Sequence, residues 1–200
     1  MKTFLAIAVG ALLAAGAGTV LAQQAAPALA TGVCSACHGP EGHSVSPVFP
    51  NLAGQQSAYI TLQLDAFRGH LRGDPNAQAY MWGMASQLSD DTIKSLADYY
   101  SAQKPMHEPA ADPSLLAEGE KIYTQGVPAQ GVPACATCHG ANAAGAGAFP
   151  RLAGQHVDYL IAQLQGFKSG TRSNAPIMLA VVRTMTDQQM KAAANYAASR

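Results

Sequence analysis

The second half of this chain repeats the first half, and this duplication limits the possible folds more than any other feature. The segment 49–55 reads Phe-Pro-Asn-Leu-Ala-Gly-Gln, and 149–155 reads Phe-Pro-Arg-Leu-Ala-Gly-Gln. Solenoid repeats have periods of about 20–50 residues. A period of 100 residues therefore predicts two copies of a whole domain rather than a stack of short units.

A proline-rich segment separates the two copies. Pro105, Pro109 and Pro113 fall within nine residues of one another, and proline both restricts the backbone and removes a hydrogen-bond donor. We therefore expect a first domain over 23–105 (lobe one), a linker over 106–112 and a second domain over 113–200 (lobe two).

The first 22 residues have the pattern of an export signal. Lys2 precedes an apolar run that extends over 3–22 and ends in Val-Leu-Ala, a small-residue cleavage pattern. A retained anchor is the alternative, because about 20 apolar residues can span a bilayer. Three glycines weaken the run, so we predict a signal peptide over 1–22 that is cleaved near Ala22, and export of the mature chain.

Neither domain has the alternating pattern of strands, and both have helical patterns. Ser89 is placed to cap one helix, and Thr186 with Gln189 forms a capping box at the start of another. Further helices are expected over 57–71 and 157–169. A helix over 114–123 begins lobe two, whereas lobe one has only 26–32 in that place, which predicts a short first helix there. The expected fold class is all-α.

The four cysteines occur as two Cys-x-x-Cys-His motifs. They are Cys34, Cys37 and His38 in lobe one, and Cys135, Cys138 and His139 in lobe two. This motif is the attachment signature of c-type haem, in which two thiols bond the vinyl groups and the histidine faces the iron. A disulfide would not need the histidine twice. A shared zinc site would need the two pairs close together, yet they lie in different halves of the chain. A thioredoxin-like redox pair would need strand–helix alternation, which the sequence lacks.

Composition excludes some classes of function. Twelve basic and twelve acidic residues give a net charge of 0, and 48% of residues are hydrophobic. A chain without a basic excess is not expected to bind nucleic acid, and the apolar fraction excludes a disordered chain. Lobes this small bury little apolar surface, and a large apolar cofactor in each would complete the core.

The repeat also selects a second iron ligand for each haem. Met81 and Met178 lie eight residues before the helix caps Ser89 and Thr186, respectively, whereas Met84 would align with Val181. We therefore predict Met81 and Met178 as the ligands opposite the histidines. The other methionines of the helical regions are expected to fill the core, and four unduplicated histidines are expected to be surface side chains: His43, His70, His107 and His156.

Two further pairs of matched residues are candidates for holding the haems. Pro50 and Pro150 follow their motifs at nearly equal distances, and each carbonyl is a suitable acceptor for the second ring nitrogen of a ligating histidine. The same prolines have a purely structural interpretation, as residues that shape the loop. Arg72 and Arg172 are also matched and are candidates for pairing with the haem propionates.

These motifs resemble the class I cytochromes c and, specifically, the di-haem cytochrome c4 family. The resemblance covers nearly all of 23–200 and rests on the paired Cys-x-x-Cys-His, the paired Phe-Pro-x-Leu-Ala-Gly-Gln, the methionines and the proline-rich linker. It implies two tandem cytochrome c-like domains, each around one covalent haem c. It also implies that Pro50 and Pro150 accept from the haem histidines and that Met81 and Met178 are axial ligands.

The resemblance further implies a periplasmic electron carrier between a quinol–cytochrome c oxidoreductase and a terminal oxidase. A di-haem subunit of a periplasmic dehydrogenase, such as the partner of a flavoprotein, uses the same fold and is the alternative. A di-haem peroxidase or gas-binding protein needs an open iron site, and the methionine in each lobe argues against an enzyme.

Charge is unevenly divided between the lobes. Lobe one has four basic and six acidic residues, and lobe two has seven basic and four acidic residues. One interpretation is solvated surface charge without a role. The other is a polar molecule whose two ends favour different partners by electrostatic steering.

Overall fold

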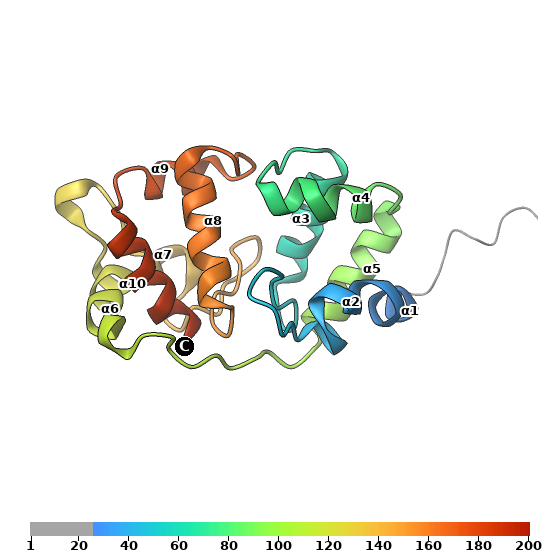
Figure 1. Ribbon diagram of the computed structural model, residues 1–200, viewed down its shortest axis with the longest axis horizontal. Coiled ribbons are helices and arrows are strands. Elements are labelled where there is room, and N and C mark those ends of the chain that lie inside the picture. Colours follow the sequence, from blue (N-terminus) through green and yellow to red (C-terminus); the bar gives the residue numbers. More distant parts are fainter. Residues whose placement is uncertain (1–25) are drawn as a thin grey trace, which may run out of the picture.

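The computed structural model describes residues 26–200, which form two helical lobes connected by the linker (Figure 1). The predicted signal peptide and its cleavage site lie outside the described residues. Within 26–200 the regular elements are helices, and β pairing is confined to the isolated bridges Val127–Val132 and Ala146–Phe149. The predicted all-α fold is confirmed. None of the described helices is long and apolar enough to cross a membrane.

Lobe one begins with a helical segment that runs directly into the first cysteine motif. A π-helical turn over Ala30–Cys34 joins its first two helices without a break. A second π-helical turn, Ala77–Met81, leads into its fourth helix. The helices are α1 (Ala26–Leu29), α2 (Ser35–His38), α3 (Ser57–Arg68), α4 (Trp82–Ala85) and α5 (Asp90–Ser101). Because α5 packs on both α1 and α3, it organises the lobe.

Lobe two follows the same plan, with a longer first helix and a longer fourth helix. They are α6 (Leu116–Gln125), α7 (Ala136–His139), α8 (Val157–Ser169), α9 (Pro176–Val182) and α10 (Asp187–Ala198). The last of these, α10, packs on α6 and α8. The crossing with α6 is close, because a Cβ added at Gly119 would lie 2.2 Å from the carbonyl oxygen of Ala192. Glycine at this position allows the two helices to touch.

Local sequence sets most helix ends. The Ser89 side chain accepts from the Thr92 amide at the start of α5, and Thr186 with Gln189 forms the expected capping box of α10. The helix expected over 57–71 ends earlier, at Arg68. Its end is followed by Gly69 and by His70 in a left-handed conformation (φ 56°), and this turn stops the helix.

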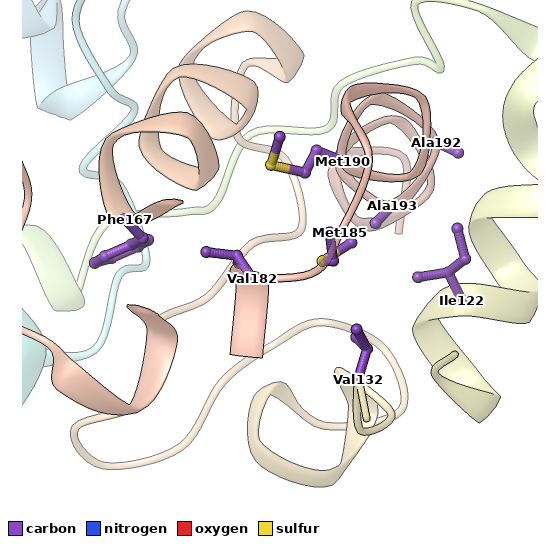
Figure 2. Close-up of a cluster of buried hydrophobic side chains, with 8 residues drawn as sticks. All are labelled: Ile122, Val132, Phe167, Val182, Met185, Met190, Ala192 and Ala193. Carbon is purple, nitrogen blue, oxygen red and sulfur yellow. The ribbon is translucent and has the colours of Figure 1, made fainter. Parts of the chain in front are cut away.

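Lobe two has two large apolar clusters, one of which is drawn in Figure 2. The cluster in the figure lies next to α10. Its side chains come from α6, α8 and α10 and from the segments between them. Met185 and Met190 are fully buried there, as expected for core-filling methionines. Lobe one instead has two smaller clusters, one around Leu96 and Tyr100 and one around Phe67.

The linker lies against both lobes rather than hanging free between them. A Cβ added at Gly54 would lie 2.3 Å from the ring of Pro105, the last residue before the linker, and one at Gly154 would lie 2.0 Å from the carbonyl oxygen of Met106, the first residue of the linker. Both glycines also have positive φ. The duplicated Ala-Gly-Gln segments therefore form the surface on which the linker rests, along the lower edge of the view in Figure 1.

Candidate functional site

The two Cys-x-x-Cys-His motifs occupy equivalent places. Cys34 ends the first π-helical turn, and α2 contains Cys37 and His38; in the second motif, Cys135 directly precedes α7. Positions i, i+3 and i+4 of a helix share a face. Accordingly, all six motif residues line one cavity of ≈ 990 Å³ that extends across both lobes.

The chemistry of the thiols fits covalent attachment better than metal binding. All four cysteines are free of disulfides. Burial raises the pKa of the Cys34 thiol, and burial raises the pKa of Cys135 to about 11. No cluster of three potential metal ligands from Cys, His, Asp and Glu occurs in residues 26–200.

Each motif histidine is held by a proline carbonyl. His38 Nδ1 lies 2.9 Å from the Pro50 oxygen, and His139 Nδ1 lies 3.0 Å from the Pro150 oxygen. A carbonyl only accepts, so Nδ1 carries the hydrogen and Nε2 keeps its lone pair. Burial lowers the pKa of both imidazoles, while the carbonyl contacts act to raise it. A neutral ring with a free Nε2 is the form that can bind iron.

The structure brings both candidate methionines to the cavity. Met81, at the end of the second π-helical turn, and Met178, in α9, line it. Met84 also lines it but is 59% exposed, so the expectation that Met84 fills the core is wrong. The reason is that α4 has only four residues and places Met84 at the cavity mouth instead of in the apolar cluster.

A buried cluster of polar residues lies where the lobes meet. The arginines cross the interface: Arg72 donates to the Tyr159 hydroxyl (3.2 Å) and Arg172 to the Tyr59 hydroxyl (2.8 Å). Both also donate to the side-chain oxygens of Gln63 and Gln163 at 2.7–3.0 Å. The matched arginines therefore bind across the interface in both directions.

The charges of this cluster do not balance. Arg72 pairs with Asp74 (Nε to Oδ1, 2.7 Å), but the matched position in lobe two is Asn174. Arg172 is 3% exposed and is in no ion pair among residues 26–200. Its Nε and the Oδ1 of Asn174 are buried without hydrogen-bond partners there.

These observations test whether the residues present fit a haem. The lining is predominantly apolar, as a macrocycle requires. A buried guanidinium without a carboxylate needs an anionic partner, and Arg172 lines the cavity. Propionates on an apolar ring meet both requirements, so the cavity fits the group.

Further contacts between the lobes were not expected from the sequence. The side-chain amides of Gln55 and Gln155, from the duplicated segment, each bind the backbone of one residue in the other lobe. Each amide donates to the carbonyl oxygen and accepts from the N–H of that residue. His156, expected to be a surface side chain, is instead half-buried and bridges Glu108 and the Ser44 carbonyl. The duplication of the two glutamines could have indicated their contacts between the lobes. No sequence pattern indicated the contacts of His156.

Comparison with known proteins identifies the family. The cytochrome c family model matches residues 23–103 and, separately, residues 116–199. The chain belongs to the cytochrome c family. It is 43% identical over 179 residues to cytochrome c4 of Thiocapsa roseopersicina, covering 86% of this chain and 90% of the relative. The Acidithiobacillus ferrooxidans cytochrome c4 structure superposes with a TM-score of 0.79 at 43% identity, covering 84% and 98% of the two chains.

Another relative is an electron acceptor for a dehydrogenase. A thiosulfate dehydrogenase electron acceptor of Thiomonas intermedia is 40% identical, covering 84% of this chain and 78% of the relative. Together the matches show a di-haem cytochrome c of the cytochrome c4 type, with two covalently bound haem c groups, one for each Cys-x-x-Cys-His motif. Its general role is electron transport.

Proposed function

We propose that this cytochrome is a periplasmic electron carrier that passes electrons from a quinol–cytochrome c oxidoreductase toward a terminal oxidase. The observation that carries the proposal is the continuous cavity. It contains both cysteine motifs and both candidate methionines and crosses the interface between the lobes. Two one-electron centres in one molecule suit a carrier that accepts and delivers electrons at different ends.

The proposed roles follow from chemistry at each lobe. Cys34 and Cys37, like Cys135 and Cys138, would attach a haem through thioethers, and the haem supplies one-electron chemistry when bound. His38 and His139 would bind iron through Nε2, oriented by Pro50 and Pro150. Met81 and Met178 would each supply a second iron ligand, and a thioether ligand favours ferrous iron and a raised potential.

A carrier of this kind leaves no iron position for a substrate, and we therefore propose that it is not an enzyme. Carbon monoxide distinguishes the two cases. The reduced, otherwise untreated protein should bind little carbon monoxide. Rapid and complete binding would contradict both the carrier role and the methionine assignment.

The thiosulfate dehydrogenase electron acceptor supports a second candidate, an acceptor for a periplasmic dehydrogenase. The two candidates differ in the donor. Native purification decides between them in part: a co-purifying dehydrogenase subunit favours the second. Reduction by quinol-fed membranes, and by a purified dehydrogenase with its substrate, should then be compared at equal cytochrome concentration. The faster donor identifies the role.

The proposed carrier role also predicts a periplasmic location for the protein. Cell fractionation should recover the haem-containing protein with periplasmic contents, with the mature chain starting near Gln23. N-terminal sequencing of that fraction tests the cleavage. A chain that still carries residues 1–22 would favour the anchored alternative.

A further inference from the structure

Two contacts across the interface are related by the repeat but use different chemistry. Gln56, the residue before α3, donates from Nε2 to the Ala144 carbonyl oxygen at 2.9 Å. His156, the residue before α8, places Nε2 3.1 Å from the Ser44 carbonyl oxygen. An amide group donates at any pH, whereas an imidazole nitrogen donates only when it carries a hydrogen.

The other ring nitrogen of His156 also faces an acceptor. Its Nδ1 lies 2.7 Å from Oε1 of Glu108, which belongs to the linker, and the two side chains are only 14% and 23% exposed. A neutral imidazole has one N–H and cannot donate to both oxygens. The arrangement is complete when both ring nitrogens carry hydrogen, or when the carboxyl group does. In either case it holds one proton more than a neutral ring beside a carboxylate.

The groups around the His156 ring come from the linker, from lobe one and from α8. Glu108 is the charged group that contacts it from the linker, and the contact from lobe one is a backbone carbonyl. Asp158 lies two residues along on α8 and is exposed. His43, the neighbour of Ser44, directs its Nε2 to the Lys104 carbonyl oxygen.

We propose that His156 is a positioning residue that joins lobe two, the linker and lobe one through a bound proton. The proton makes the apposition of the two lobes depend on pH on this side of the interface. The Gln56 contact, on the other side, is independent of pH. The proposal goes beyond the electron-carrier role and does not depend on which proteins donate or accept the electrons.

The direction of the effect follows from which state binds the proton. The joined lobes favour the protonated bridge, so lowering the pH stabilises them. Raising the pH until the bridge loses its proton removes one hydrogen bond and leaves one ring nitrogen, without a hydrogen, facing an acceptor oxygen. At low enough pH the carboxylate of Glu108 is also protonated, and the charge attraction is lost. Electron exchange between the lobes should follow the same profile, because it depends on how they are held.

The decisive variant is H156Q, because the chain itself uses glutamine for the matching contact. Thermal unfolding of the haem-loaded wild type and of H156Q should be compared between about pH 5 and about pH 8, where imidazoles ordinarily titrate. We expect the melting temperature of the wild type, relative to H156Q, to rise on acidification by about 2–4 °C. As a matched control, Q56A should lose stability equally at every pH.

Two further measurements keep the test decisive if H156Q fails to fold. Nitrogen-15 NMR of the wild-type ring should show both nitrogens protonated at the pH of greatest stability, or a protonated Glu108 beside a neutral ring. E108Q, which removes the carboxylate that faces Nδ1, should reduce the pH dependence of the melting temperature, as H156Q does. A neutral ring beside an ionised Glu108 at that pH would overturn the proposal, as would equal pH profiles of wild type and H156Q. None of these readouts uses a redox partner, so they are independent of the proposed function.

Discussion

Lobe one and lobe two build the same cavity wall on different scaffolds. In lobe one a continuous helical segment, Ala26–His38, leads straight into the cysteine motif. In lobe two the ten residues 126–135 separate α6 from α7. Yet the histidine–proline contacts differ by only 0.1 Å in length. The residues proposed to hold the haems are matched between the lobes, whereas the segments that lead into the cysteine motifs differ, because many packings can support one wall.

The interface shows the same contrast at a single pair of positions. Asp74 neutralises Arg72, and Asn174 leaves Arg172 without a carboxylate. Tyrosines and glutamines around them are duplicated and bind across the interface in both directions. A two-fold arrangement of contacts therefore holds an asymmetric charge.

Removing the candidate ligand from one lobe should have the largest effect. Met81→Ala and Met178→Ala should each allow carbon monoxide to bind at one haem and lower the potential of that haem, leaving the other nearly unchanged. Carbon monoxide stoichiometry and redox titration measure this. Met84→Ala is the control and should leave both irons closed. If Met84→Ala opens an iron and Met81→Ala does not, the assignment in lobe one is wrong.

Removing a carboxylate from the interface and adding one should have unequal effects. Asp74→Asn leaves Arg72 buried without its carboxylate and should cost about 3–5 kcal/mol of unfolding free energy. Asn174→Asp places a carboxylate near Arg172, to which the haem propionates would already supply an anion, and should change the unfolding free energy far less. Denaturant unfolding of the haem-loaded proteins measures both. Equal losses from the two substitutions would contradict the dependence of Arg72 on Asp74.

The scaffold difference predicts a lobe-specific loss of stability. Gly119→Ala places a Cβ against the Ala192 carbonyl and should destabilise lobe two by about 1–3 kcal/mol. Gly32→Ala, in the first helical segment of lobe one, meets nothing within 4 Å and should be neutral or stabilise by up to about 1 kcal/mol. Hydrogen exchange resolved by lobe separates the two. A loss confined to lobe one in Gly119→Ala would contradict the packing argument.

Charge asymmetry should have the smallest effect, and on rates alone. Electron transfer to one physiological partner should slow as salt rises, because screening acts beyond a Debye length of about 8 Å at physiological ionic strength. Reversing basic charges on lobe two should change one partner's rate far more than the other's. Stopped-flow kinetics at several salt concentrations measure this. Rates independent of salt for both partners would leave the charges without a role in steering.

The helical class, the duplication and the positions of the cysteine motifs were all predictable from the sequence. Each depends on near neighbours: caps such as Ser89 and Thr186 act within one turn, and the i, i+3, i+4 spacing of a motif acts within one helix. Matching the two halves extended this local information, because Met81 and Met178 stand out only when the copies are compared.

Contacts between segments far apart in the chain were decided by the tertiary structure alone. The sequence places Arg72 and Asp74 two residues apart but says nothing of Tyr159, which lies across the interface from them. The same holds for His156, whose partners, Glu108 and Ser44, are 48 and 112 residues away. Local patterns determined which elements form. The docking of the two lobes determined which polar groups became buried together, because burial depends on surfaces that meet only in the folded chain.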